Sequence, residues 1–235
     1  MDLTHALRST GAVREFTEDP VSDEVLHRLL DTARFAPNGG NRQAWKVVIL
    51  RDPDLRARMR DLYLLHWYEY LALRAAGLTP FAPVHDPAAE AAALEREPAF
   101  RAAAEAGGAG FAEEIDRAPA LLAVLADQRY LAAMDRGFSR YTMVGGASIY
   151  PFVWSILLAA HGEGLGGVLT TAAIREEGAA EALLGAPPEY AMAGLLALGY
   201  PAGKRATKLR RNPVEDFTTV DSLTGPAFTP SGSGD

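Results

Sequence analysis

Four short apolar segments, separated by helical patterns, constrain the fold of this chain more than any other feature. Residues 45–50 (WKVVIL) are aromatic and β-branched and are followed by Pro53, which is typical of a buried strand. Residues 120–126 (ALLAVLA) predict a second strand, and residues 166–172 and 190–200 predict two more. Strands that interleave with helices without strict alternation predict one domain, of the α+β or the α/β class.

Helical periodicity occupies the intervals between these strands. Residues 23–35 predict a capped amphipathic helix, because Ser22 can cap it and apolar side chains recur at helical spacing. Residues 54–76 predict a long helix and residues 175–184 a shorter one. Residues 147–161 are almost wholly apolar, so we expect this helix to be central and buried.

Two segments do not fit this pattern. Residues 79–118 hold prolines followed by an Ala/Gly/Glu-rich stretch, which favours short helices, and we expect an inserted helical cover there. Residues 223–235 are turn-forming and weakly apolar, so we expect a disordered tail. The folded domain is therefore predicted to span residues 1–222.

Composition excludes several classes of protein. The chain has no cysteine, which removes disulfides and thiolate metal sites. Its formal net charge of −7 opposes polynucleotide binding. It has no apolar run of membrane-spanning length and no signal-peptide pattern. We therefore expect a cytoplasmic protein that binds neither membrane nor nucleic acid.

No catalytic side-chain motif stands out. The five histidines are scattered without metal-ligand spacing, so no metal site is predicted. Residues 162–167 (GEGLGG) match the G-x-G-x-x-G pattern, but here a helix precedes the glycines and a strand follows them, the reverse of a dinucleotide site. We interpret these glycines as a helix stop and a turn. The absence of an evident general acid or base favours chemistry carried by a bound cofactor.

Two basic clusters and one polar loop are candidate binding elements. Arg8, Ser9, Thr10 and Arg14 lie within seven residues of one another near the N-terminus. Residues 203–212 contain no acid and carry Lys204, Arg205, Lys208, Arg210 and Arg211. These clusters are either solvated surface or, together, a site for one phosphate of a small ligand. The loop of residues 36–43 (APNGGNRQ) is either a connecting turn or a reader of a heterocycle edge.

Taken in order, these motifs resemble the FMN-dependent nitroreductase family. The resemblance rests on residues 13–16 (VREF), 36–45 (APNGGNRQAW), 164–167 (GLGG) and 198–202 (LGYPA), and it spans most of residues 3–220. It implies a nitroreductase-like α+β fold with a mixed central sheet flanked by helices. It also implies an intertwined homodimer with FMN in each of two interface sites.

The resemblance also implies roles for individual residues. Those implied to hold the FMN phosphate and ribityl chain are Arg8, Ser9 and Arg14, with Lys208, Arg210 or Arg211 from the tail. Those implied to lie against the flavin or its ribityl chain, some of them from the partner subunit, are Pro37, Asn38, Gly39, Asn41 and Gln43. Leu169 and Thr170 correspond to the strand end whose backbone faces the isoalloxazine ring.

The implied activity is hydride transfer from NADH or NADPH through FMN to a nitroaromatic, a quinone or a similar flat electrophile, with no catalytic side chain. Residues 60–110, including the aromatic residues Trp67, Tyr68, Tyr70 and Phe81, form either the substrate-side cover or part of the core. Alternatives on the same fold are reductive dehalogenation and flavin cleavage. A flavin-binding or deazaflavin-binding protein without turnover is the alternative of a different class.

Overall fold

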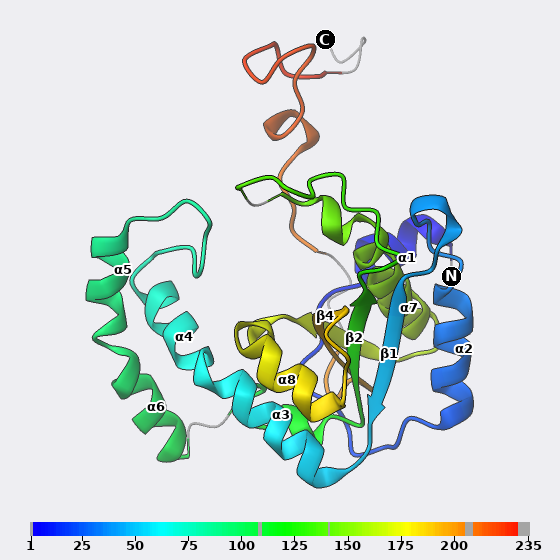
Figure 1. Ribbon diagram of the computed structural model, residues 1–235, viewed down its shortest axis with the longest axis vertical. Helices are drawn as coiled ribbons and strands as arrows, with labels where there is room; N and C mark the ends of the chain where they lie inside the picture. The colour runs from blue at the N-terminus through cyan, green and yellow to red at the C-terminus, as the bar shows by residue number, and fades with distance from the viewer. Residues whose placement is uncertain (1, 108–109, 141, 205–208, 230–235) are drawn as a thin grey trace.

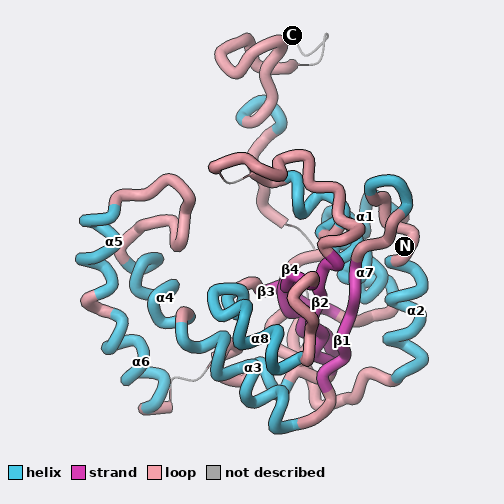
Figure 2. Tube along the Cα trace, viewed as in Figure 1, coloured by secondary structure: helices cyan, strands magenta, loops and turns pink. Residues whose placement is uncertain are grey.

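Four strands form one antiparallel sheet at the centre of the fold (Figure 2). The computed structural model describes residues 2–107, 110–140, 142–204 and 209–229. The strands are β1 (Trp45–Leu50), β2 (Ala120–Asp127), β3 (Gly166–Thr170) and β4 (Tyr190–Gly199). They lie in the order β1-β2-β4-β3 with each neighbouring pair antiparallel. Within the described residues, parallel pairing is limited to an isolated bridge between Ala12 and Gly167 beside β3. The predicted α+β class is confirmed.

Helices cover both faces of the sheet (Figure 1). They are α1 (Leu3–Ser9), α2 (Asp23–Ala33), α3 (Pro53–Leu65), α4 (Trp67–Ala75), α5 (Pro87–Leu94), α6 (Glu97–Glu105), α7 (Tyr150–Gly162) and α8 (Glu177–Leu184). Leu122 and Val124 of β2 pack with α2 and α7, whereas Leu121 and Leu125 pack with α3 and α8 on the other face. This alternation follows from the period of two in a strand, and it makes β2 buried along its whole length.

Two helices differ from the sequence-based expectation. The predicted long helix at 54–76 is two helices, because His66 leaves helical geometry (φ −112°, ψ 1°) between α3 and α4. The apolar helix begins at Tyr150 and is buried on one face only, since Tyr150 and Trp154 are each 39% exposed. Periodicity did not indicate α1, a seven-residue helix capped by the Asp2 side chain, which accepts from the N–H of His5 (2.9 Å).

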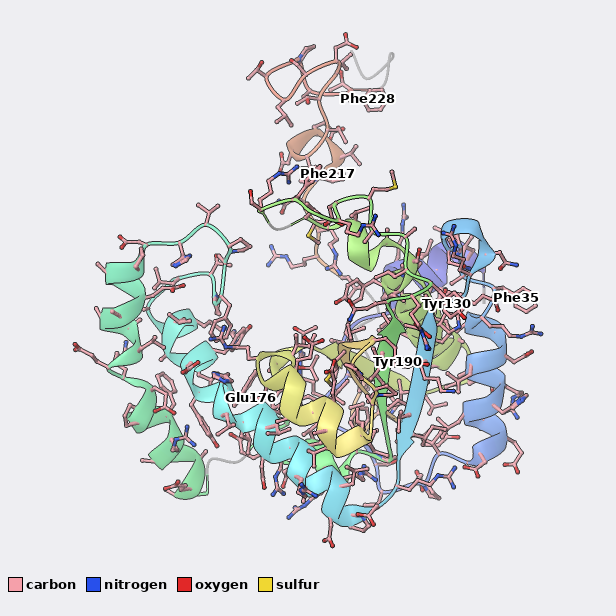
Figure 3. The ribbon with its side chains drawn as sticks, in the orientation of Figure 1. Phe35, Tyr130, Glu176, Tyr190, Phe217 and Phe228 are labelled. Carbon is pink, nitrogen blue, oxygen red and sulfur yellow. The ribbon has the colours of Figure 1, made fainter. Side chains whose placement is uncertain are left out.

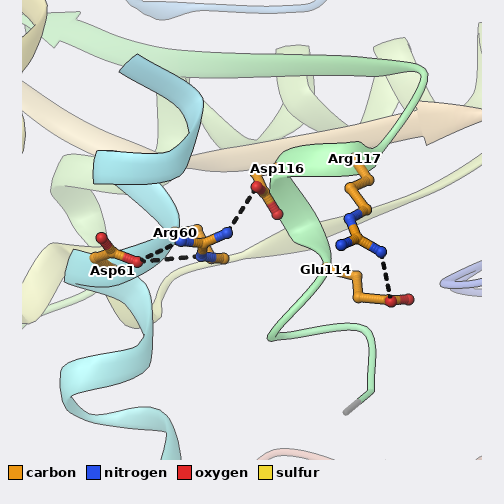
Figure 4. Close-up of polar contacts among 5 residues, drawn as sticks. All are labelled: Arg60, Asp61, Glu114, Asp116 and Arg117. Carbon is orange, nitrogen blue, oxygen red and sulfur yellow. Dashed lines mark hydrogen bonds and ion pairs between the residues drawn. The ribbon is translucent and has the colours of Figure 1, made fainter. Parts of the chain in front are cut away.

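The described part of residues 79–118 includes the short helices α5 and α6, which pack against α4 and lie apart from the strands (Figure 1). A short 3-10 helix, η2 (Ile115–Arg117), returns the chain to α3. There Arg60 of α3 binds both Asp61 and Asp116, each at 2.8 Å (Figure 4). Arg56 donates to the carbonyl of Ala118 beside this pair. The C-terminal end of this segment is therefore anchored to α3 by these polar contacts.

The N-terminal segment lies along the open side of β3. The N–H of Val13 donates to the carbonyl of Gly167 (2.9 Å), and the N–H of Ala202 donates to the carbonyl of Glu15 (3.0 Å). Glycine at 166 permits this approach, because a Cβ built there would overlap the side chain of Val13. The segment on either side of Arg14 is thus held by backbone hydrogen bonds.

The C-terminal segment projects away from the body (Figures 1 and 3). Within its described part, which ends at residue 229, Thr219 and Ala227 form an antiparallel bridge. The disorder expected for residues 223–235 stays a prediction. Among the described residues, we find no helix with the length and apolar character needed to span a membrane.

Candidate functional site

Two cavities meet at Arg14. The narrow cavity, about 310 Å³, lies between the backbone of residues 9–14, helix α7 and strand β3, and Arg211 reaches it from the C-terminal segment. The wide cavity, about 1060 Å³, lies between the end of β3 and helices α3 and α4. Arg14, Val168 and Leu169 line both cavities. The two cavities therefore adjoin at Arg14 and at the Val168–Leu169 part of β3.

Arg14 occupies the junction of these cavities. Its backbone is fixed on both sides by the bonds of Val13 and Glu15 described above, and its side chain is exposed. Within the described part of the chain, Arg14 makes no ion pair with Glu15, Glu18 or any other carboxylate. Its guanidinium donors remain available to an anion in either cavity.

The other members of the N-terminal cluster are placed differently from Arg14. Ser9 lines the narrow cavity, but its hydroxyl donates to the carbonyl of His5 (2.6 Å) and contacts Nε2 of His161 (2.9 Å). The hydroxyl of Thr10 donates to the carbonyl of Ala6 (2.7 Å). Arg8 lines neither of the two cavities and faces a neighbouring hollow on α1.

The tail cluster contributes through Arg211. Arg211 lines both the narrow cavity and the hollow that Arg8 faces. Arg210 lines neither cavity, and its carbonyl accepts from Nη1 of Arg211 (2.7 Å). Lys208, a predicted phosphate ligand, lies outside the described residues. The structure therefore brings Arg14 and Arg211 to one cavity and leaves Arg8 and Arg210 outside it.

The loop of residues 36–43 is an ordered turn away from these cavities. Asn38 accepts from the N–H of Gln43 (2.9 Å), and the N–H of Gly39 donates to the Ser148 hydroxyl (3.0 Å). Asn41 and Gln43 both have a φ of 52°. None of the predicted residues Pro37, Asn38, Gly39, Asn41 and Gln43 contributes to the lining of either cavity. The loop follows α2, which lies across β1 and β2 from α4 (Figure 1).

Strand β3 supplies one wall of the wide cavity through Leu169 and Thr170, and the contact of their backbone with a flavin ring stays a prediction. Tyr63 of α3 stands beside them and is 2% exposed. Burial raises the pKa of Tyr63, against the opposing influence of a hydrogen bond to Thr170 and of nearby Arg14. Its hydroxyl is thus protonated across the ordinary pH range and can donate a hydrogen bond.

Aromatic rings from the end of α3 and from α4 supply the facing wall. The ring centroids of Tyr63 and Trp67 are 5.6 Å apart, and those of Trp67 and Tyr70 are 5.1 Å apart with planes 8° from parallel. Phe81 closes the same wall. Tyr68, also predicted for the cover, is buried away from the cavity and lies under the guanidinium of Arg101 (4.7 Å).

Sequence reasoning missed Tyr63, Arg74 and Arg175 as residues that line this cavity. The spacing of residues 63, 67, 70 and 74 follows one helical face and was the available signal. Arg175 lies in a short 3-10 helix, η4 (Ala172–Glu176), and the sequence pattern there does not predict which way its side chain points.

His66 fixes α4 to the body at the break between α3 and α4. Its Nδ1 lies 2.7 Å from Glu69 of α4, and its Nε2 lies 2.8 Å from Glu176 of η4. Burial of the ring lowers the pKa of His66, and Arg175 adds to that, but the bonds to Glu176 and Glu69 outweigh both, so the pKa is raised above its ordinary 6.5. The cation can donate to both carboxylates at once, whereas neutral imidazole has a single N–H.

We expect this link to weaken as the pH rises. Because the folded-state pKa of His66 is raised, its contribution to stability is complete below about pH 6.5 and is lost as the pH rises through the folded-state value. Loss of one charged bond is worth about 1.5 kcal/mol. Urea unfolding of the parent and His66→Gln, compared at pH 6 and pH 9, checks this expectation. A difference between the two proteins that does not change with pH would contradict it.

Comparison with known proteins agrees with this fold. The model of the nitroreductase family matches residues 7–200, so the chain belongs to the nitroreductase family and is an oxidoreductase of that family. A 5,6-dimethylbenzimidazole synthase from Rhodobacter capsulatus is 30% identical over 199 residues, covering 85% of this chain and 83% of that protein. A Thermus thermophilus NADH dehydrogenase is 29% identical over 202 residues, covering 86% of this chain and 88% of that protein.

Solved structures show the same fold at lower identity. A BluB-like flavoprotein from Clostridium difficile has a TM-score of 0.67 and 22% identity, covering 93% of this chain and 98% of that one. An iodotyrosine deiodinase bound to FMN and 3-iodo-L-tyrosine has a TM-score of 0.60 and 24% identity, covering 91% of this chain and 96% of that one. The names of these relatives describe different reactions, so family membership does not by itself define the substrate.

Proposed function

We propose that this protein binds FMN in the two joined cavities and passes electrons from NADH or NADPH to a flat electrophile such as a nitroaromatic or a quinone. The observation that carries the proposal is that Arg14 lines two adjoining cavities, a narrow one that Arg211 also lines and a wide one with aromatic walls. This order suits a ligand with a phosphate at one end and a planar ring at the other.

The residues present fit FMN. The narrow cavity offers Arg14, Arg211 and the backbone of residues 9–13 to a phosphate and a polyol chain. The wide cavity offers the backbone of Leu169 and Thr170 to the edge of a ring. A phosphate at Arg14 would gain a charge-assisted bond that no carboxylate among the described residues contests.

When bound, FMN supplies the hydride chemistry. The chain's own residues hold the reactants and exclude water: Trp67, Tyr70 and Phe81 form a wall on which a flat molecule stacks. The protonated hydroxyl of Tyr63 donates a hydrogen bond beside the end of β3, and Arg14 favours negative charge there. Residues 79–118 act as a cover through Pro80, Phe81 and Phe111, the members of this segment that line the cavity.

We also propose that the protein is a homodimer. The loop of residues 36–43 lies outside both cavities of its own chain, so its implied flavin contacts require a second copy. The C-terminal segment carries apolar side chains far from any core, with Phe217 68%, Leu223 97% and Phe228 54% exposed (Figure 3). Trp154 of α7 adds a further exposed aromatic ring. Surfaces of this kind are typical of interfaces.

Light scattering is expected to give twice the 25.1 kDa chain mass. A chain that ends at Asn212 lacks the exposed apolar side chains of Phe217, Leu223 and Phe228. We expect its dimer to dissociate at concentrations where that of the full chain does not. The matched control is a chain that ends at Thr229, which keeps every described apolar residue. A 25.1 kDa monomer that still holds flavin would overturn the shared-site proposal.

One alternative reaction is favoured by a specific relative. The 30% identity to a 5,6-dimethylbenzimidazole synthase extends over 85% of the chain and makes consumption of the flavin itself a second candidate function. In that case a reduced, aerated sample would lose its bound flavin after one turnover. An oxidoreductase would keep the flavin through many turnovers.

The absorption spectrum of the purified protein, before and after anaerobic NADPH, tests the proposal. We expect a flavin spectrum that is bleached by NADPH or NADH and restored by a quinone. A yellow protein that neither nucleotide bleaches would indicate a flavin-binding protein without turnover. A colourless protein that takes up no added FMN would overturn the proposal.

A further inference from the structure

The wide cavity contains two arginines besides Arg14. Arg74 lies on α4 and Arg175 on η4, and both are exposed at the cavity wall. No acidic residue contributes to the lining. Within the described part of the chain, neither Arg74 nor Arg175 has a carboxylate within 4.0 Å. The wall opposite β3 therefore carries two arginines that have no salt-bridge partner among the described residues.

Two acids on the adjoining elements are engaged by His66. Glu176 follows Arg175 directly in the chain, but its Oε1 lies 2.8 Å from Nε2 of His66. Glu69 of α4 binds the other ring nitrogen of His66 at 2.7 Å. Both carboxylates are thus hydrogen-bonded to one imidazole, and neither forms an ion pair with Arg74 or Arg175.

Arg175 is held in a defined position by Phe81. The centre of its guanidinium lies 4.4 Å from the centroid of the Phe81 ring. Stacking of this kind uses the face of the guanidinium and leaves its edge N–H groups free for an anion. Phe81 has a φ of 56°, which is unusual for a bulky residue and is sustained only where the surroundings require it. The Phe81–Arg175 pair is thus a built feature of the cavity.

The same cavity offers aromatic rings to a ligand. Trp67 and Tyr70 stack 8° from parallel, and both line the cavity. The volume of about 1060 Å³ reaches the upper end of the range for a drug-sized ligand. There is room for a second planar molecule beside a flavin ring at Leu169 and Thr170.

The geometry points to an acceptor that joins a planar ring to a carboxylate, sulfonate or phosphate group. The ring packs against the stacked pair of Trp67 and Tyr70, and Arg74 and Arg175 bind the anion. Arg14 is assigned to the cofactor, because it also lines the narrow cavity. This inference rests on the proposed function, since the β3 wall is taken to hold the flavin.

A binding measurement tests the charge preference without turnover. The purified full-length protein is titrated calorimetrically at low salt with benzoate and with benzamide, which share a ring and differ in charge. Benzoate is expected to bind at least about tenfold more tightly, the effect of one charge-assisted bond. Arg74→Gln and Arg175→Gln are each expected to remove most of that preference. Arg96→Gln, the same change at an exposed arginine outside the cavity lining, keeps it within about twofold.

Turnover gives a second readout. The parent is expected to have a KM about tenfold lower for 4-nitrobenzoate than for 4-nitrobenzamide, and the two cavity variants are expected to raise only the former. The KM values for NADH and NADPH are measured in parallel. If the variants raised the KM for NADPH alone, these arginines would bind the 2′-phosphate of the hydride donor, and the inference would be wrong.

The outcomes separate the inference from the proposed function. If neither nitro compound is reduced but benzoate binding still depends on Arg74 and Arg175, the anionic subsite stands and the oxidoreductase proposal fails. If both compounds are reduced but benzoate and benzamide bind the parent equally, the subsite is overturned and the proposed function stands.

Discussion

Replacing Arg14 with Ala is expected to weaken FMN binding by about ten- to a hundredfold while leaving the fold intact. Arg14 lines both cavities, and its side chain makes no ion pair within the described residues, so its removal costs little packing. A charge-assisted bond to phosphate is worth about 1.5–3 kcal/mol, which accounts for the size of the effect. Quenching of FMN fluorescence on titration into apo-protein measures it.

Two further variants sharpen this test. Arg14→Lys should recover only part of the affinity, because an ammonium group cannot reproduce a planar bidentate contact. Arg8→Ala removes the same charge from a residue that lines neither cavity, so we expect a change within about threefold. An Arg14→Ala protein that binds FMN within about twofold of the parent would remove Arg14 from the site.

The second large effect is expected at Gly167. A Cβ built on this residue overlaps Cδ2 of Leu198 and lies 2.6 Å from the carbonyl oxygen of Ala197. Both residues belong to β4, which is paired on two sides and fully buried there, so it has no room to move. Gly167→Ala should therefore lower the free energy of unfolding by about 2–3 kcal/mol. Thermal unfolding is expected to show a Tm lower by about 5–10 °C.

Gly162→Ala is the matched control. A Cβ at Gly162, in the last turn of α7, meets nothing within 4 Å. Alanine there should leave stability unchanged or raise it by up to about 1 kcal/mol. Equal Tm values for the two variants would show that the β3–β4 pair tolerates the added methyl group and that the close approach is not required.

Local pattern was sufficient for most of the fold. The strand predicted at 45–50 matches β1, and the strand predicted at 120–126 is one residue shorter than β2. These runs are apolar and bounded by turn residues, so local composition defines their ends. The break at His66 was not predicted, because it depends on carboxylates from α4 and from the distant η4 rather than on helix propensity.

The site residues could be predicted only where they belong to two backbone segments that pair with each other. Arg14, Leu169 and Thr170 lie at the cavities because they belong to the N-terminal segment and to β3, which are paired. Arg8 falls outside because α1 ends between it and Arg14, which turns the earlier residues toward another hollow. Arg175 was missed because its direction depends on Phe81, nearly a hundred residues away in the chain.

The pairing of residues 12–13 with β3 also has a consequence for solubility. β3 is an edge strand, and open N–H and C=O groups along such an edge are a template for pairing with another chain. The bridge between Ala12 and Gly167 closes part of that edge with the chain's own backbone. Because the same segment carries Arg14, a ligand bound there also protects the edge against intermolecular strand pairing. Protein stripped of its ligand is therefore the form most exposed to aggregation, and excess FMN during purification should suppress it.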